Sequence, residues 1–305
     1  MEQNRKPAAG DGGAEQLVGS VAKYSISTVL NFVISGIALV LGSFVIPDQA
    51  LYGEVVQFTA FTNTIMTIVI FGLDQGFIRF YSEPPGKTGS AGIFRLCFYL
   101  STSVLAASGV VCSLFFAGPL RALFAFNQLG PEIIPLLFLN AFFWMVARYF
   151  YTLYRMEQNI LHYTLVSLLM NFCYRLAYLL GALFTQNGFL IVLCSLLALV
   201  LLALYLLVSR RKILRPRRAD WDKPTLKALV PYSAAVAPTA VMVVLNSSFS
   251  LVFVATYINE AARGTYGYGV QVSNLVTAIQ GGFASFWGAY MFANYKTRQP
   301  LIKKV

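Results

Sequence analysis

Arginine side chains stand inside strongly apolar stretches of this sequence, where a charge needs a partner or water. Arg175 follows Asn171 by four residues and precedes Tyr178 by three, so the three side chains share one helix face. Arg148 follows Asn140 by eight residues in the preceding apolar stretch and shares a face with it. An arginine near the bilayer centre costs at least about 2.5–3.5 kcal/mol on insertion scales. That cost indicates a function, and a guanidinium group is suited to binding an anion.

The depth of each arginine in the membrane separates the possible interpretations. At 1.5 Å per residue, Arg175 lies about 20 Å from the start of its apolar stretch, near the midplane, and Arg148 lies about 10 Å deep. Together with Arg79 and Arg95 near the surface, they form a ladder of cations. We therefore expect Arg175, Arg148 and Arg79 to bind substrate. The alternatives are a structural hydrogen bond for the deepest arginine, and snorkelling of the charge to the surface for the other two.

The stretch from Tyr52 to Tyr81 adds an acid and an amide to this set. We predict one continuous membrane helix here, because about 20 mostly apolar residues suffice to cross a bilayer. Gly72 and Gly76 allow close contact with a neighbouring helix. Asp74 is the candidate for ion coupling, with pairing to an arginine as its alternative, and Gln75 is a candidate for substrate binding.

Asparagine side chains complete the candidate site. Asn31 belongs to a polar stripe with Thr28 and Ser35 in the first apolar stretch, and Asn171 shares its face with Arg175. We expect both asparagines to line a cavity, although such side chains also form ordinary hydrogen bonds between membrane helices. The predicted substrate-binding residues are therefore Arg175, Arg148, Arg79, Asn171, Asn31 and Gln75.

The composition indicates a membrane protein. Of 305 residues, 57% are hydrophobic and 11% are charged, with a mean hydropathy of +0.66, whereas a soluble domain carries about 25% charged residues. The net charge of +11 does not indicate nucleic-acid binding, because it is concentrated in short segments between apolar stretches. One histidine, and four cysteines without ligand-like spacing, predict no metal site. The sequence has no nucleotide-binding or catalytic-triad motif, so we expect neither a cofactor nor enzyme activity.

Eight apolar stretches predict an all-α polytopic helical bundle. Connectors after the even stretches carry most of the Lys and Arg residues, and those after the odd stretches contain only Arg121 and Arg263. Since positive residues favour the cytoplasm, we expect both chain ends inside. Pro231 and Pro238 predict a kinked or broken seventh helix. The predicted stretches are 23–46, 53–78, 93–117, 132–154, 162–184, 188–208, 227–258 and 265–293.

A weak internal repeat indicates two lobes. YGEVVQFT at Tyr52 is similar to YGYGVQVS at Tyr266, and each follows a long apolar stretch. Internal repeats are common in secondary transporters. Because the repeat restarts and then breaks off, we expect the natural protein to be longer. The predicted parts are a cytoplasmic tail (1–22), an N-terminal lobe of six membrane helices (23–208), a basic linker (209–226) and the first two helices of a C-terminal lobe (227–305).

Three strings along the chain carry a resemblance to a known family. They are KYSISTVLNF at Lys23, the P-x-x-x-x-YG turn from Pro47 to Gly53, and GLDQGFIRFY at 72–81. Together they resemble the oligosaccharide and polysaccharide flippases of the multidrug/oligosaccharidyl-lipid/polysaccharide exporter superfamily. The resemblance implies a two-lobed architecture of 12 to 14 membrane helices around a central cavity, of which eight are present here.

The same resemblance implies an activity. Such flippases transfer undecaprenyl-pyrophosphate-linked oligosaccharide repeat units across the plasma membrane by alternating access, often coupled to H⁺ or Na⁺. The products serve the synthesis of cell-surface polysaccharides such as O-antigen or capsule. A cavity lined by cations suits the pyrophosphate group, because arginine is well matched to phosphate oxygens.

Two other functions are weighed against this one. A multidrug exporter of the same superfamily would favour acidic cavity residues, and here Asp74 stands nearly alone against several arginines. An integral-membrane polysaccharide polymerase needs a sizeable extramembrane loop or an acidic catalytic pair, and the connectors on the predicted outer side have at most about 14 residues. We therefore expect a flippase whose partners are lipid-linked oligosaccharide, membrane lipids and a coupling ion, and not nucleic acid.

Overall fold

A computed structural model of the chain describes residues 12–86, 88–127, 129–216 and 221–273. Within these residues the regular secondary structure is helical and no strand is present. Residues 260–273, which follow the last labelled helix, are also helical. The labelled helices are α1 (Gly12–Val45), α2 (Gln49–Ile70), α3 (Leu73–Tyr81), α4 (Ser90–Phe115), α5 (Ala117–Leu123), α6 (Ile133–Met156), α7 (Ile160–Arg175), α8 (Ala177–Phe184), α9 (Gly188–Ser209) and α10 (Lys223–Tyr257).

Six helical segments of the described chain are long and apolar enough to cross a membrane, and the protein is an all-α membrane protein. They correspond to the second to seventh predicted stretches. The first predicted stretch contains a shorter apolar helix, Ser27–Gly42, inside α1. Most of the eighth, 265–293, lies outside the described residues. The six segments are Gln49–Ile70, Ser90–Phe115, Ile133–Met156, Ile160–Phe184, Gly188–Ser209 and Lys223–Tyr257.

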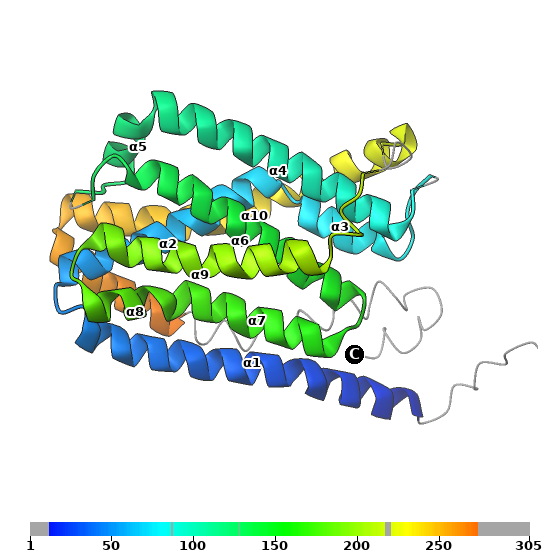
Figure 1. Cartoon of the computed structure of the whole chain (residues 1–305), viewed down its shortest axis with the longest axis horizontal. Helices are drawn as coiled ribbons and strands as arrows, with labels where there is room; N and C mark the ends of the chain where they lie inside the picture. The colour runs from blue at the N-terminus through cyan, green and yellow to red at the C-terminus, as the bar shows by residue number, and fades with distance from the viewer. Residues whose placement is uncertain (1–11, 87, 128, 217–220, 274–305) are drawn as a thin grey trace, which may run out of the picture.

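The helices lie side by side in a bundle, and the chain reverses direction between successive long helices (Figure 1). The α3–α4, α6–α7 and α9–α10 connectors meet at one end of this bundle. We name it the basic end, because these connectors contain most of the connector Lys and Arg residues. The α1–α2 and α8–α9 connectors, the segment around α5, and the residues directly after α10 (258–263) lie at the opposite end.

Side-chain caps fix where several helices begin. Asp48 Oδ1 accepts hydrogen bonds from the backbone N–H groups of Ala50 at 2.9 Å and Leu51 at 3.4 Å, which starts α2. Asn187 caps α9 by accepting from Phe189 N–H at 3.0 Å. Short polar side chains satisfy the first N–H groups of a helix, which otherwise have no partner within it. The caps therefore fix the sharp reversals at the end opposite the basic end.

The prediction of one continuous helix from Tyr52 to Tyr81 is wrong, because the helix is interrupted between α2 and α3. Phe71 and Gly72 both adopt left-handed conformations, with φ of 47° and 73°. A Cβ added at Gly72 would lie 2.4 Å from the carbonyl oxygen of Ser233 in α10. The interruption thus brings the backbone against α10, and the predicted close helix contact of the Gly72–Gly76 pair is confirmed.

Two further helix boundaries differ from expectation. Helix α10 runs through Pro231 and Pro238 without a break, so of the two predicted outcomes, a kink or a break, the break is absent. Neighbouring helices can compensate the hydrogen bond that each proline removes. The stretch predicted as one helix at 162–184 is divided at Leu176 into α7 and α8. Arg175 is consequently the last residue of α7, next to an irregular point in the bundle.

Candidate functional site

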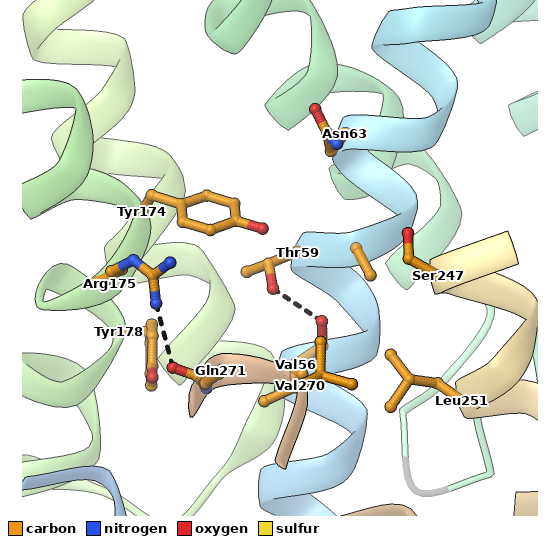
Figure 2. Close-up of a pocket in the computed structure, with 11 residues that line it drawn as sticks. Val56, Thr59, Asn63, Tyr174, Arg175, Tyr178, Ser247, Leu251, Val270 and Gln271 are labelled. Carbon is orange, nitrogen blue, oxygen red and sulfur yellow. Dashed lines mark hydrogen bonds between the residues drawn. The ribbon is translucent and has the colours of Figure 1, made fainter. Parts of the chain in front are cut away.

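A cavity of about 140 Å³ lies between α2, the α7–α8 junction, α10 and the helical stretch 260–273. Figure 2 shows Tyr174, Arg175 and Tyr178 on one side of it, facing side chains of α2. Small polar and apolar groups complete the wall. The lining residues are Val56, Thr59, Ala60, Asn63, Tyr174, Arg175, Tyr178, Ser247, Leu251, Val270 and Gln271.

Arg175 is the cationic group of this cavity. Its guanidinium donates a hydrogen bond to Gln271 Oε1 at 3.3 Å and lies 5.8 Å from the ring centroid of Tyr174. In the described part of the chain it forms no ion pair with a carboxylate. A guanidinium has five N–H donors, and a single long hydrogen bond leaves most of them available. The arrangement can therefore bind an anion that enters the cavity.

Gln271 connects this arginine to the end of the bundle opposite the basic end. Its amide nitrogen donates to the Tyr52 hydroxyl at 2.5 Å, and the Tyr52 ring stacks on Tyr268 with a centroid distance of 4.0 Å. These residues belong to the two similar strings at Tyr52 and Tyr266. The two strings, distant in sequence, therefore pack against one another.

A second cavity of about 270 Å³ lies between α1, α6 and α7, and Arg175 and Tyr174 line both cavities. Asn31 and Asn171 line this second cavity and also join α1 to α7. The Asn31 amide donates to Ser167 Oγ at 2.7 Å, and the Asn171 amide donates to the Asn31 carbonyl oxygen at 2.9 Å. Asn31 Oδ1 is buried and has no hydrogen-bond partner. The two asparagines thus combine the predicted cavity position with helix-joining hydrogen bonds.

Asp74, Gln75 and Arg148 come together at a different place. Asp74 Oδ2 lies 2.7 Å from a terminal nitrogen of Arg148, and Asp74 Oδ1 accepts from the Gln75 backbone N–H at 2.9 Å. The Gln75 side chain donates to Asp74 Oδ2 at 3.4 Å. The Asp74 side chain is 10% exposed and that of Arg148 is 37% exposed. Asp74 therefore pairs with Arg148 and neutralises its charge, as in the alternative that the sequence analysis gave for Asp74.

The predicted ladder of cations is not a row of equivalent charges. The guanidinium of Arg79 lies 5.6 Å from the ring centroid of Phe80. Arg95 is buried and donates to the carbonyl oxygen of Ile213, which fixes the segment after α9. Among the described arginines of the predicted ladder, Arg175 is the one that lines these cavities.

A buried ion pair between Glu54 and Arg263 was not predicted from the sequence. Arg263 and Glu54 approach to 3.2 Å, and both side chains have 0% exposure. Arg263 also donates to Gln57 Oε1 at 3.0 Å and to the Ala125 carbonyl oxygen at 2.8 Å. The available signal was an acid in an apolar stretch and one arginine in a connector that has no other Lys or Arg, both at the same predicted membrane side.

The described residues contain no ready-made metal site. Among the described residues, no group of three or more His, Cys, Asp and Glu side chains lies close enough to hold an ion. The two described cavities offer hydrogen bonds, a positive charge and aromatic surface. The chain matches no protein-family model, no curated protein and no solved structure.

Proposed function

We propose that this protein is a flippase that moves a lipid-linked oligosaccharide, carried on undecaprenyl pyrophosphate, across the plasma membrane by alternating access. The proposal continues the resemblance of GLDQGFIRFY and the two other strings to polysaccharide flippases. In this proposal the basic end faces the cytoplasm, because positive connectors favour that side. We propose further that the chain comprises an N-terminal lobe of six membrane helices and the first two helices of a second lobe.

One observation carries the proposal: the guanidinium of Arg175 faces a cavity within an apolar bundle and has no carboxylate partner in the described chain. Arg175 lies 15 residues into α7 from the basic end, which corresponds to a depth of about 22 Å. A cation so far from water needs compensation, and a pyrophosphate supplies charge together with oxygen acceptors. We assign Arg175 to the pyrophosphate, with Tyr174, Tyr178 and Gln271 around it.

The remaining candidates take other roles in this proposal. Asn31 and Asn171 border the second cavity, beside the pyrophosphate position. Arg148, Arg79 and Gln75 contact the head group only during its passage from the basic end, and not in the arrangement described here. Asp74 couples transport to H⁺ or Na⁺ through the opening of its pair with Arg148. A multidrug exporter receives less support, because Asp74 is already occupied by that arginine.

The test is complementation of a flippase-deficient strain with the full-length protein. We expect Arg175→Ala to abolish polysaccharide export at normal membrane abundance. Arg175→Lys should restore only part of it, because lysine keeps the charge but loses the planar fork. The matched control is Arg211→Ala, an arginine outside both cavities on the connector after α9. Normal export by Arg175→Ala at normal abundance would remove the residue that carries the proposal.

A further inference from the structure

The buried pair of Glu54 and Arg263 joins two separate parts of the chain. Glu54 and Gln57 belong to α2, and Ala125 follows α5, whereas Arg263 belongs to the helical stretch 260–273 after α10. The three groups that contact the Arg263 guanidinium, on Glu54, Gln57 and Ala125, thus come from the predicted N-terminal lobe, and the arginine itself comes from the predicted C-terminal lobe. The contact therefore spans the boundary that alternating access has to open and close.

The acceptor side of this contact has hydrogen bonds that do not involve the arginine. Glu54 accepts hydrogen bonds from the backbone N–H groups of Asn127 at 2.7 Å and Leu129 at 3.1 Å. The Gln57 side-chain nitrogen donates to the Phe124 carbonyl oxygen. Backbone N–H groups that donate to a carboxylate stabilise its negative charge, and the Glu54 carboxylate keeps these donors when Arg263 moves away. Arg263 is thus a removable partner that inserts into a preformed set of acceptors.

The backbones at this contact approach closely, beside the buried Arg263 side chain. A Cβ added at Gly264 would lie 2.1 Å from the carbonyl oxygen of Gln49, and one added at Gly53 would lie 2.9 Å from the Gly264 nitrogen. Two glycines at a crossing let the segments meet and part with little side-chain rearrangement. The contact is therefore tight when closed and separable when open.

The position of the pair relates it to the substrate cavity. Glu54 precedes the cavity residue Thr59 by five residues, about 7.5 Å along α2, and Arg263 precedes Gln271 by eight residues, about 12 Å along its helix. Both displacements lead away from the basic end. The pair thus lies between the cavity and the opposite end of the bundle.

We propose that the Glu54–Arg263 pair is the closed gate of the cavity at the end opposite the basic end, and that release of substrate requires the pair to separate. Gln271 supplies the connection to the cavity, because it bonds Arg175 and Tyr52 in the arrangement seen here. An anion that binds the Arg175 guanidinium displaces Gln271 from it. The helical stretch 260–273, which carries both Gln271 and Arg263, then loses this contact with α7. The gate proposal rests on the proposed function, whereas the result of the first test does not depend on that function.

The first test measures access to the cavity in the full-length protein with its native cysteines replaced. A single Thr59→Cys cysteine reports access to a membrane-impermeant maleimide added from the side of the proposed gate. We expect Glu54→Gln to raise the labelling rate about tenfold or more, because removing one charge from a buried pair favours the open state. Glu157→Gln is the matched control, since it breaks an exposed pair with Arg210 near the basic end.

A purely structural pair would give a different result in this test. Glu54→Gln would then lower thermal stability while the labelling rate of the Thr59→Cys cysteine stayed unchanged, and that outcome would overturn the gate. Labelling at the wild-type rate in a normally stable Glu54→Gln protein would overturn it as well. No substrate is needed, so the result stands whether or not the protein transports lipid-linked oligosaccharide.

The second test locks the gate without altering the buried pair. The Asn127 side chain donates to Glu260 Oε1 at 2.7 Å near the surface of the same junction. We expect a reversible bifunctional thiol reagent to stop export by the Asn127→Cys/Glu260→Cys protein, and a reductant to restore it. Each single cysteine variant should export normally after the same treatment. Continued export by the cross-linked protein would overturn the gate, whereas absent export in the untreated wild-type protein would count against the proposed function alone.

Discussion

Helices α2 and α3 contact α10 and its continuation at two ends, and the two contacts are built differently. Near the basic end, Gly72 and Gly76 bring uncharged backbone against Ser233 and Leu229. At the opposite end the contact depends on the fully buried pair of Glu54 and Arg263. Close backbone packing gives many weak contacts that are lost together, whereas a buried ion pair concentrates its strength in a few atoms. Glycines bring backbones together at both ends, and the end opposite the basic end adds a buried ion pair, so that end is the more suitable one for switching.

The largest effect should follow from breaking the charged contact. Arg263→Ala leaves the Glu54 carboxylate buried without its cation, which we expect to cost about 3–5 kcal/mol of unfolding free energy. Thermal unfolding in detergent and membrane abundance both measure this loss. The double variant Glu54→Gln/Arg263→Met should lose less than the single variant, because it leaves no unpaired charge. A single variant as stable as the wild-type protein would show that the pair contributes little to the closed contact.

Substitution at the glycine contact near the basic end should cause a smaller loss of unfolding free energy. Gly72→Ala places a Cβ 2.4 Å from the Ser233 carbonyl oxygen and requires a left-handed alanine, which we expect to cost at least about 2 kcal/mol. Gly36→Ala in α1 is the matched control, since a Cβ there meets no atom within 4 Å. The control should be neutral or slightly stabilising in the same thermal measurement. Equal stability of both variants would contradict the close contact between the α2–α3 junction and α10.

The smallest loss of stability should come from the cavity between the two contacts. Arg175→Ala removes a hydrogen bond to Gln271 at 3.3 Å, so we expect the free energy of unfolding to change by about 1 kcal/mol or less. The same substitution should abolish export, and the contrast with Arg263→Ala separates an arginine that binds substrate from one that holds the structure. A loss of stability as large as that of Arg263→Ala would favour the structural alternative for Arg175.

Local pattern predicted the positions of most described helices. The predicted stretch 188–208 corresponds to α9 (Gly188–Ser209), and 132–154 corresponds to α6 (Ile133–Met156). These boundaries follow from local hydropathy and from capping residues such as Asn187. The interruption at Phe71–Gly72 was missed, because a glycine in an apolar stretch is compatible with a continuous membrane helix. Only the contact with Ser233 of α10 requires the left-handed turn there.

The candidate site was predicted in part. Apolar surroundings and helical spacing led to Arg175, Asn31 and Asn171, and these three side chains line the described cavities. Arg263 was missed because its partners are distant in sequence: Gln57 is 206 positions away and Ala125 is 138 positions away. No local period connects residues so far apart, and a connector arginine has an ordinary explanation in topology.

The sequence by itself determined that the described chain is an all-α membrane protein and that each buried arginine has to be compensated. Both conclusions depend on transfer free energies, which are properties of residue types and of short stretches. The tertiary structure alone decided how each arginine is compensated. Asp74 neutralises Arg148, Glu54 neutralises Arg263, and Arg175 has a glutamine and a cavity. Coulomb energies and hydrogen bonds depend on distances of a few ångströms between atoms of different helices, and only helix packing sets those distances.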